Sequence, residues 1–195
     1  GNASHSEGYY TTAGGEYSHA EGDNTSAIGK NSHSEGTETL ASGYNAHAEG
    51  NSTTSSGDNS HSEGQSTKAI GVASHSEGDY TTAGGKYSHA EGSGTKSNGE
   101  SSHAEGFQTT ASGECSHVEG ISSSATGKGS HVEGYNTIAS GEYSHVYGKY
   151  NVKDTANKYV SIVGNGVSNT GRSNAYTLDW GGNAWFKGSI KIGGT

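Results

Sequence analysis

The sequence has no proline, no methionine, a single cysteine and few apolar residues. Hydrophobic residues make up 27% of the 195 residues, against roughly 45–50% in ordinary soluble domains, so one chain alone cannot bury a core of normal size. The absence of proline fits a backbone whose N–H groups are nearly all used in a hydrogen-bonded ladder. The lone Cys115 excludes an intrachain disulfide framework, and we interpret it as an incidental thiol at a turn.

Basic residues are also scarce. Eleven Lys and Arg stand against 20 Asp and Glu, which gives a net charge of −9. Ten of the acidic residues are the Glu of a recurring His-x-Glu motif, and the rest of the chain is almost neutral. Without a basic stripe, nucleic acid is not expected as a partner. No apolar run approaches the roughly 18 residues of a transmembrane helix, and we expect no membrane insertion by this part of the chain.

The feature that is abundant is a repeat. All 11 histidines recur at a strict spacing of 14 residues, and the first ten are each followed two residues later by Glu, as in Ser18-His19-Ala20-Glu21-Gly22. A fixed period of this kind is typical of a solenoid, and it outweighs the low hydrophobicity that would otherwise indicate disorder. We predict an all-β solenoid over residues 1–148 and a different β-strand or hairpin region over residues 149–195.

Glycine recurs at every seventh residue of the array and divides each 14-residue unit into two halves. Each unit then reads as strand, turn, strand, turn, with glycine providing a positive φ at both turns. Because side chains alternate across a strand, Ser18 and Ala20 point to one side and His19 and Glu21 to the other. The interior of so narrow a coil accepts only small residues, and we therefore expect His and Glu to face outward.

The outward residues fall into two classes. On one strand of each coil they vary, as at Thr12, Lys68 and Ile138, whereas on the other His and Glu recur almost without exception. A coil lined by Ala and Ser buries little apolar area, which at ~25 cal/mol per Å² cannot offset ~1–2 kcal/mol of backbone entropy per residue. We therefore predict that the His–Glu face packs against copies of itself.

The predicted interface takes from each coil the histidine and the residue two positions after it. These residues are His5, Glu7, His19, Glu21, His33, Glu35, His47, Glu49, His61, Glu63, His75, Glu77, His89, Glu91, His103, Glu105, His117, Glu119, His131, Glu133, His145 and Tyr147.

The repeat Ser-His-Ala-Glu-Gly-x-x-Thr-x-Ala-Ser-Gly, as in residues 102–113, resembles the 14-residue repeat of YadA-like heads of trimeric autotransporter adhesins. The resemblance covers about residues 1–148 and implies a left-handed parallel β-roll with three chains around one axis. His19 and Glu21 take the places of a Val and an Ile that face neighbouring subunits in that family. The resemblance therefore implies a homotrimer in which an ionisable centre replaces an apolar one.

After Lys149 the repeat stops and apolar residues gather. Strands are predicted over 159–163, 175–180 and 184–192, and together they are expected to form a separate, better-packed β element. The segment 173–188 looks like one found late in tail-fibre or appendage proteins of phages and prophages of Gram-positive bacteria. This second resemblance implies a structural shaft or head segment of a phage tail fibre, located in the virion. A bacterial surface adhesin head is the alternative.

The His–Glu face admits more than one chemistry. A ladder of His–Glu hydrogen bonds between chains would fix the register of the trimer. Imidazole and carboxylate groups are also zinc and nickel ligands, but a uniform ladder offers no distinct closed site. We therefore predict no metal site and no cofactor, and the alternatives are axial ions at the His rungs or a His/Glu metal-binding array. Adjacent Ser and His point to opposite faces, so no catalytic residue and no enzymatic activity are predicted.

Two further expectations concern charge and attachment. We predict that Glu raises the pKa of the histidines, which would make the trimer less stable as the pH rises through the folded value. Aromatic residues near the turns, such as Tyr9, Tyr80 and Phe107, could stack on sugars. A host cell-surface glycan or protein is therefore a candidate partner besides further copies of the chain.

Overall fold

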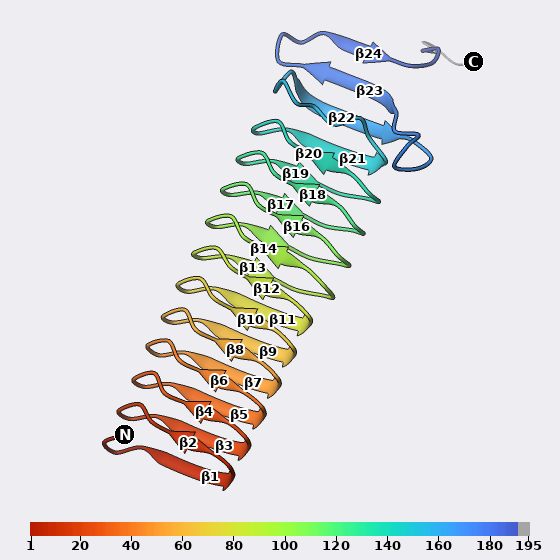
Figure 1. The fold of residues 1–195 in the computed structure, drawn as a ribbon. Coiled ribbons are helices and arrows are strands. Elements are labelled where there is room, and N and C mark those ends of the chain that lie inside the picture. The colour runs from red at the N-terminus through yellow and green to blue at the C-terminus, as the bar shows by residue number, and fades with distance from the viewer. Residues whose placement is uncertain (191–195) are drawn as a thin grey trace, which may run out of the picture.

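The computed structural model describes residues 1–190, which wind into a solenoid with two parallel walls (Figure 1). Each 14-residue unit adds one strand to a 14-stranded sheet and one to a 10-stranded sheet. Among the described residues no helix is long and apolar enough to cross a membrane. The predicted all-β parallel roll is confirmed.

The larger sheet continues past the last coil into the tail of the chain. Its strands, in sheet order, are β1 (His5–Tyr9), β3 (His19–Asp23), β5 (His33–Thr37), β7 (His47–Asn51), β9 (His61–Gln65), β11 (His75–Asp79), β13 (His89–Ala90), β15 (His103–Ala104), β17 (His117–Val118), β19 (His131–Val132), β21 (His145–Lys149), β22 (Tyr159–Asn165), β23 (Asn174–Asp179) and β24 (Ala184–Phe186).

The smaller sheet is confined to the repeat array. Its two-residue strands are β2 (Thr12–Ala13), β4 (Ser26–Ala27), β6 (Leu40–Ala41), β8 (Thr54–Ser55), β10 (Lys68–Ala69), β12 (Thr82–Ala83), β14 (Lys96–Ser97), β16 (Thr110–Ala111), β18 (Ser124–Ala125) and β20 (Ile138–Ala139).

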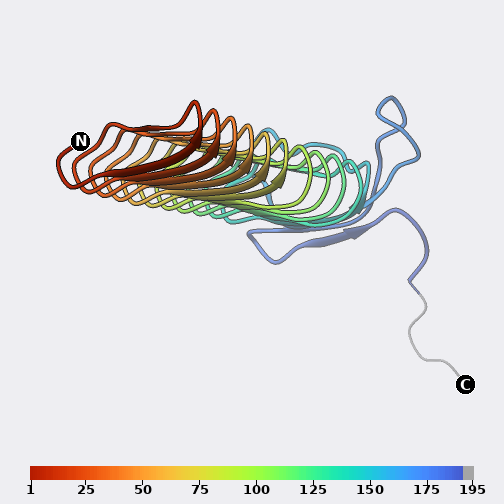
Figure 2. The same ribbon diagram turned by 90° about the horizontal axis from the view of Figure 1, so that it is seen from below.

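Successive coils pair in parallel with a shift of one repeat. His5 lies opposite His19 in the larger sheet, and Thr12 lies opposite Ser26 in the smaller one. Neighbouring strands in a sheet are about 4.8 Å apart, so equivalent residues form straight columns along the array. Figure 2 shows the coils one behind another as a flattened tube.

Small residues fill the inside of the tube, as predicted. Ala27 and Ala48 are fully buried, and most of the buried hydroxyl groups find partners inside the coil. The hydroxyls of Ser34 and Thr39, for example, are 2.7 Å apart. Pairing matters because a buried hydroxyl without a partner costs about 1–3 kcal/mol. In the coil where Ala48 replaces serine, the hydroxyl of Thr53 has no such partner.

The interior becomes apolar toward the tail. The residue after His is Val in the last three coils, and these Val side chains are buried in one continuous cluster. The members of the cluster are Ala104, Ala111, Val118, Ala125, Val132, Ala139, Val146 and Ile162.

Glycine serves the two turns differently, which corrects the expectation of a positive φ at both. Gly50 has a φ of 107°, as expected. At the other turn the positive φ falls on Asn45, at 54°, and not on Gly43. Gly43 is required by close packing instead, because a Cβ there would collide with the carbonyl oxygen of Gly57 in the next coil. The second glycine column therefore reflects contact between coils.

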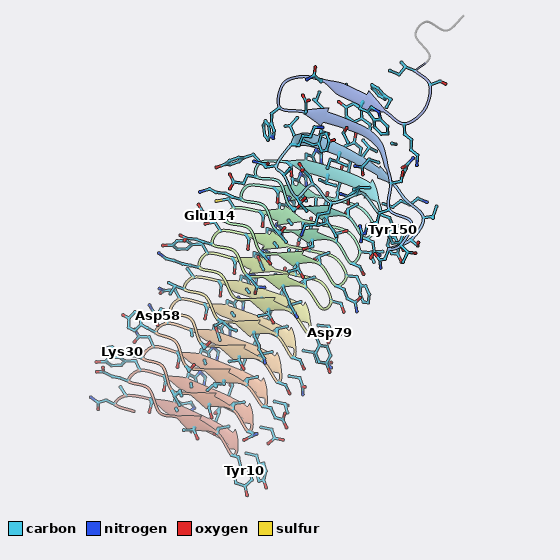
Figure 3. All side chains as sticks on the ribbon, turned by 45° about the horizontal axis from the view of Figure 1, so that its top comes forward. Tyr10, Lys30, Asp58, Asp79, Glu114 and Tyr150 are labelled. Atoms are coloured by element: carbon cyan, nitrogen blue, oxygen red, sulfur yellow. The ribbon has the colours of Figure 1, made fainter. Side chains whose placement is uncertain are left out.

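The two kinds of turn run along opposite edges of the roll (Figure 3). Tyr10 and Asp79 mark one edge, and Lys30 and Glu114 mark the other. Positive-φ residues lie near both edges, at Tyr10 and Asn31 for example.

The tail forms the predicted strands but not the predicted separate element. The strand β22 pairs in parallel with β21, and β23 and β24 follow antiparallel, so the tail extends the larger sheet (Figure 1). The strand β24 ends at Phe186, short of the predicted 184–192, and residues 191 and 192 lie outside the described part.

The tail is also less well packed than expected. Trp180 and Trp185 are 51% and 54% exposed, and Phe186 is 44% exposed. Tyr176 and Phe186 face each other across the β23–β24 pair with ring centroids 4.9 Å apart. Adjacent Trp185 and Phe186 point to opposite faces, so the β23–β24 pair presents aromatic rings to solvent on both faces, and β24 has no further strand beside it among the described residues.

Candidate functional site

The candidate site is the outward face of the larger sheet, where the predicted interface residues come together. Strand alternation places them as expected: Ser18 and Ala20 are buried, while His19 and Glu21 are half-buried and point outward. Parallel pairing repeats this arrangement in each coil, so one His column and one Glu column run side by side. We call these two columns together the His–Glu ladder, from His5 and Glu7 to His145 and Tyr147.

The histidines form a regular stack. From His19 to His145, neighbouring rings have centroids 4.7–4.9 Å apart and planes within 1–7° of parallel. His5, in the exposed first coil, is tilted by 56° to His19. The stack holds all the rings in one orientation, so their Nε2 atoms point to the same side, toward the Glu column.

From His33 onward, each Nε2 atom lies close to a carboxylate of the preceding coil, whereas His5 and His19 lie nearest to Glu7 and Glu21 of their own coils. His47 Nε2 is 3.4 Å from Glu35 Oε1, and from His33 to His145 the equivalent distances lie between 3.4 and 3.9 Å. These distances exceed the roughly 2.7–3.2 Å of an N–H···O hydrogen bond. Within one chain the contacts are therefore pairs across coils without hydrogen bonds, and the predicted ladder of His–Glu hydrogen bonds between chains stays a prediction.

The consequence is a column of buried nitrogen atoms without partners. In ten of the coils the Nε2 atom is inaccessible to solvent and makes no hydrogen bond. The residues concerned are His19, His33, His47, His61, His75, His89, His103, His117, His131 and His145.

The Glu column borders shallow grooves. One groove of about 590 Å³ is lined by four Glu and four Gly residues, from Glu35 to Gly78. A second, of about 560 Å³, is lined by residues of the same two kinds from Glu7 to Gly36. Because glycine has no side chain, the carboxylates lie beside open space.

Neighbouring carboxyl groups change one another's protonation. Hydrogen bonds with the carboxyls of Glu63 and Glu35 raise the pKa of Glu49 to about 7. The hydrogen bond with Glu49 in turn lowers the pKa of Glu35. Bare carboxylates a few ångströms apart repel, and one proton held between two of them relieves the repulsion. Glu35 and Glu49 therefore favour different protonation states.

Burial acts on the histidines in the opposite direction to the one predicted. The pKa of His33 and of His61 is lowered, first by burial, which disfavours the charged imidazolium, and then by the charge of His47. The nearby carboxylates raise these pKa values, but by less. The prediction that Glu raises the histidine pKa is wrong at these two positions.

The ladder ends differently at its two ends. In the first coil His5 and Glu7 are exposed and form a hydrogen bond 3.3 Å long. In the last coil Tyr147 takes the place of Glu, and its ring lies 5.3 Å from that of His145. The carboxylate column therefore ends before the tail strands begin.

Several parts of the ladder bring together donor atoms that suit a metal ion. Five groups of three side chains place one ligand atom each within 4.8 Å of the others. The groups are His5/Glu7/His19, His33/Glu35/His47, His89/Glu91/His103, Glu49/His61/Glu63 and Glu63/His75/Glu77.

Sequence reasoning missed two features of this surface. It did not foresee that each His from His33 onward would approach the Glu of the preceding coil, 12 residues earlier. It also treated Phe107 as a separate aromatic near a turn and did not foresee a continuous apolar row, in which Phe107, Ile121 and Tyr135 are bridged coil to coil and are 44–47% exposed. The signal was available, because these three residues are spaced by 14 and directly follow the glycines of the motif.

Comparison with known proteins bears on the repeat array. Residues 6–32, 34–60 and 62–88 match a family model described as YadA head domain repeat (2 copies). No curated protein sequence matches the chain. The matched residues contain both carboxylate grooves.

Proposed function

The repeats of this chain are YadA-like β-roll head repeats, a structural adhesin type, and from this premise we propose that the chain is a segment of a homotrimeric fibre. The His–Glu ladder faces the other two chains in this assembly. The full set of predicted interface residues, from His5 to Tyr147, lines the contact. The role is structural and not enzymatic.

One observation carries the proposal: the outward His and Glu residues recur in nearly every coil, yet the Nε2 atoms of the histidines find no hydrogen-bond partners within the chain. Ten buried Nε2 atoms lack hydrogen bonds, and a buried polar group left alone costs about 1–3 kcal/mol. The outward residues of the smaller sheet vary between Thr, Lys, Leu and Ile, as expected of a solvated wall. A surface whose residues are the same in nearly every coil, and whose buried polar atoms lack hydrogen-bond partners, is typical of an interface between copies of a chain.

The size of the interior supports the same proposal. The coil buries mainly Ala, Ser and Thr, and these side chains contribute little apolar area per residue. Covering the half-exposed face of the ladder on three chains would add the burial that one chain lacks.

Light scattering coupled to size exclusion tests the assembly. We expect three times the chain mass of 19.8 kDa. A monomer or a dimer at micromolar concentration would overturn the proposal.

A pair of matched variants tests which face assembles. Changing His61 and His75 to Asp adds two carboxylates to the ladder, and like charges without a donor should dissociate the trimer. Changing Thr54 and Thr82 to Asp makes the same change in charge at half-buried, outward positions of β8 and β12. Dissociation by the Thr pair, or by neither pair, would show that the ladder is not the interface.

We further propose that this fibre belongs to a phage tail and contributes to attachment to the host surface. The support is the resemblance of residues 173–188 to late segments of tail-fibre proteins, together with the exposed aromatic residues of the tail. Gold-labelled antibodies against the chain should decorate phage tails in electron micrographs. Decoration of the surface of uninfected bacteria would favour the alternative, a bacterial adhesin head.

A further inference from the structure

We propose that the His–Glu ladder binds divalent ions of the zinc, nickel and cobalt type, each held by a carboxylate and by histidines of its own and the next coil. The two best sites are His33/Glu35/His47 and His89/Glu91/His103. This inference needs the residues of one chain only and goes beyond the structural role.

The spacing of the donor atoms fits a bound metal ion. Zinc lies about 2.0–2.1 Å from imidazole nitrogen and carboxylate oxygen, so two donors at neighbouring corners of a tetrahedron are about 3.4 Å apart. His47 Nε2 and Glu35 Oε1 are 3.4 Å apart, and so are His103 Nε2 and Glu91 Oε1. The same gap is too wide for a hydrogen bond. It fits an ion between the two atoms better than a shared proton.

The state of the histidines is the second argument. The Nε2 atoms are buried and unpartnered, and a metal ligand must be a neutral imidazole with a free nitrogen lone pair. Stacking fixes the rings, with planes 7° apart at His33–His47 and 4° apart at His89–His103. The nitrogens are therefore aimed at the carboxylates before any ion arrives, which reduces the ordering cost of binding.

Donor type and burial distinguish the two best sites, because all five groups have their ligand atoms within 4.8 Å of one another. His33/Glu35/His47 and His89/Glu91/His103 each combine two His with one Glu, and all their members are half-buried. Two His and one Glu with an open fourth position is a familiar zinc set. Only the carboxylate and the histidine of the next coil already lie at the tetrahedral spacing of 3.4 Å. The histidine of the carboxylate's own coil must rotate out of the stack to become the third ligand.

Charge is the last argument. The chain carries a net charge of −9, and much of that charge lies along one column of Glu residues beside open grooves. Divalent cations between the columns would offset the repulsion between these carboxylates. In the proposed fibre these ions lie inside, between the chains.

Titration with cobalt tests the sites directly. The protein is unfolded, freed of metal with a chelator and refolded in the presence of Co²⁺, so that an assembled fibre does not block access of the ion to the sites. Bound Co²⁺ is then measured by its visible absorption. We expect about two bound ions per chain and the intense bands of tetrahedral coordination. Failure to bind Co²⁺, or Zn²⁺ by calorimetry, at about 1 mM would overturn the proposal.

Variants locate the ions. Replacing His47 and His103 with Gln removes one donor from each site, and we expect at least a tenfold loss of Co²⁺ affinity together with loss of the tetrahedral bands. Replacing His131 and His145 with Gln makes the same change at histidines of the ladder outside the three-donor groups, and binding should persist. Equal affinity in both variants would overturn the assignment. Should the first variant fail to fold, Glu35→Gln with Glu91→Gln tests the same sites.

The mass of the chelator-treated protein separates this inference from the proposed function. A metal-free trimer that binds no ion would contradict the proposed metal sites but support the proposed fibre. A monomer that binds two ions would support the metal sites but contradict the fibre.

Discussion

The inward and outward residues of each strand in the larger sheet differ in how their polar groups are paired. On the inside the residues vary among Ala, Ser and Val, but their hydroxyls mostly find partners within the coil, as Ser34 and Thr39 do. On the outside His and Glu hardly vary, yet His47 Nε2 is left 3.4 Å from the nearest carboxylate oxygen. The inside therefore tolerates substitution because each coil satisfies itself, whereas the constant outside depends on groups that the chain does not supply.

The largest effect is expected where two coils touch. Gly50 has a φ of 107°, and a Cβ there would collide with the carbonyl oxygen of Gly64. Gly50→Ala should lower the free energy of unfolding by about 3 kcal/mol or more, because neither the backbone strain nor the clash can be relieved cheaply. The midpoint and slope of chemical denaturation measure the loss.

Gly182→Ala is the matched control. Gly182 also has a positive φ, 83°, but a Cβ there would meet nothing within 4 Å. This variant introduces backbone strain but no clash, and its free energy of unfolding should fall by about 1 kcal/mol. Equal losses in both variants would show that contact between coils contributes nothing to the requirement for glycine.

A smaller effect is expected from the apolar end of the interior. Val132 is fully buried in the cluster that reaches Ile162. Val132→Ala removes two methyl groups and should cost about 2 kcal/mol, from lost burial and an unfilled cavity. Ile121→Ala, at a position 45% exposed, should cost much less by the same denaturation measurement. A larger loss at Ile121 would mean that the row Phe107, Ile121 and Tyr135 is itself buried in the assembly.

A buried hydroxyl inside one coil lacks a partner, and supplying that partner should stabilise the protein. Thr53 Oγ1 is buried without a partner because the coil has Ala48 where others have serine. Ala48→Ser should add the missing hydrogen bond and about 1 kcal/mol of stability. Ala104→Ser should add little, since the hydroxyl of Thr109 already donates to the carbonyl oxygen of Glu105. An equal gain at both sites would contradict this explanation.

The architecture could be predicted because two simple periods set it. The 14-residue spacing sets the length of one coil. The alternation of side chains along a strand places Ala20 inside and His19 outside. Composition could not show that the left-handed conformation falls on Asn45. It also could not show that Gly43 is needed because a Cβ there would collide with the next coil. Both depend on how closely the backbones of adjacent coils approach, which a one-dimensional pattern does not contain.

The chemistry of the ladder was less predictable for the same reason. The sequence places His47 nearest to Glu49, but stacking of the rings turns its Nε2 toward Glu35 of the coil before, at 3.4 Å against 3.9 Å. The sign of the histidine pKa shift follows from burial, which only the packed columns reveal. In the tail, the hydrophobic pattern gave the strands, but β22 pairs with β21 because the open edge of the last coil accepts another strand.

The smallest expected effect is that of pH on the ladder, because it combines two terms of opposite sign. Burial lowers the pKa of His61 below its ordinary 6.5, so its contribution to stability is intact above that value and is lost as the pH falls through it. Neighbouring carboxyls raise the pKa of Glu49 from 4.5 to about 7. Its contribution is therefore present at low pH and is lost as the pH rises toward 7.

Single variants separate the two terms. Between about pH 8 and pH 5 the melting temperature of the wild type, relative to His61→Gln, should fall, since only the wild type must charge a buried imidazole. Relative to Glu49→Gln it should rise over the same range, since the wild type regains a proton that relieves carboxylate repulsion. Melting curves with a chelator present, at one protein concentration, measure both differences without metal. Slopes of the same sign would show that burial of His61 and repulsion at Glu49 do not govern the outward face as its geometry implies.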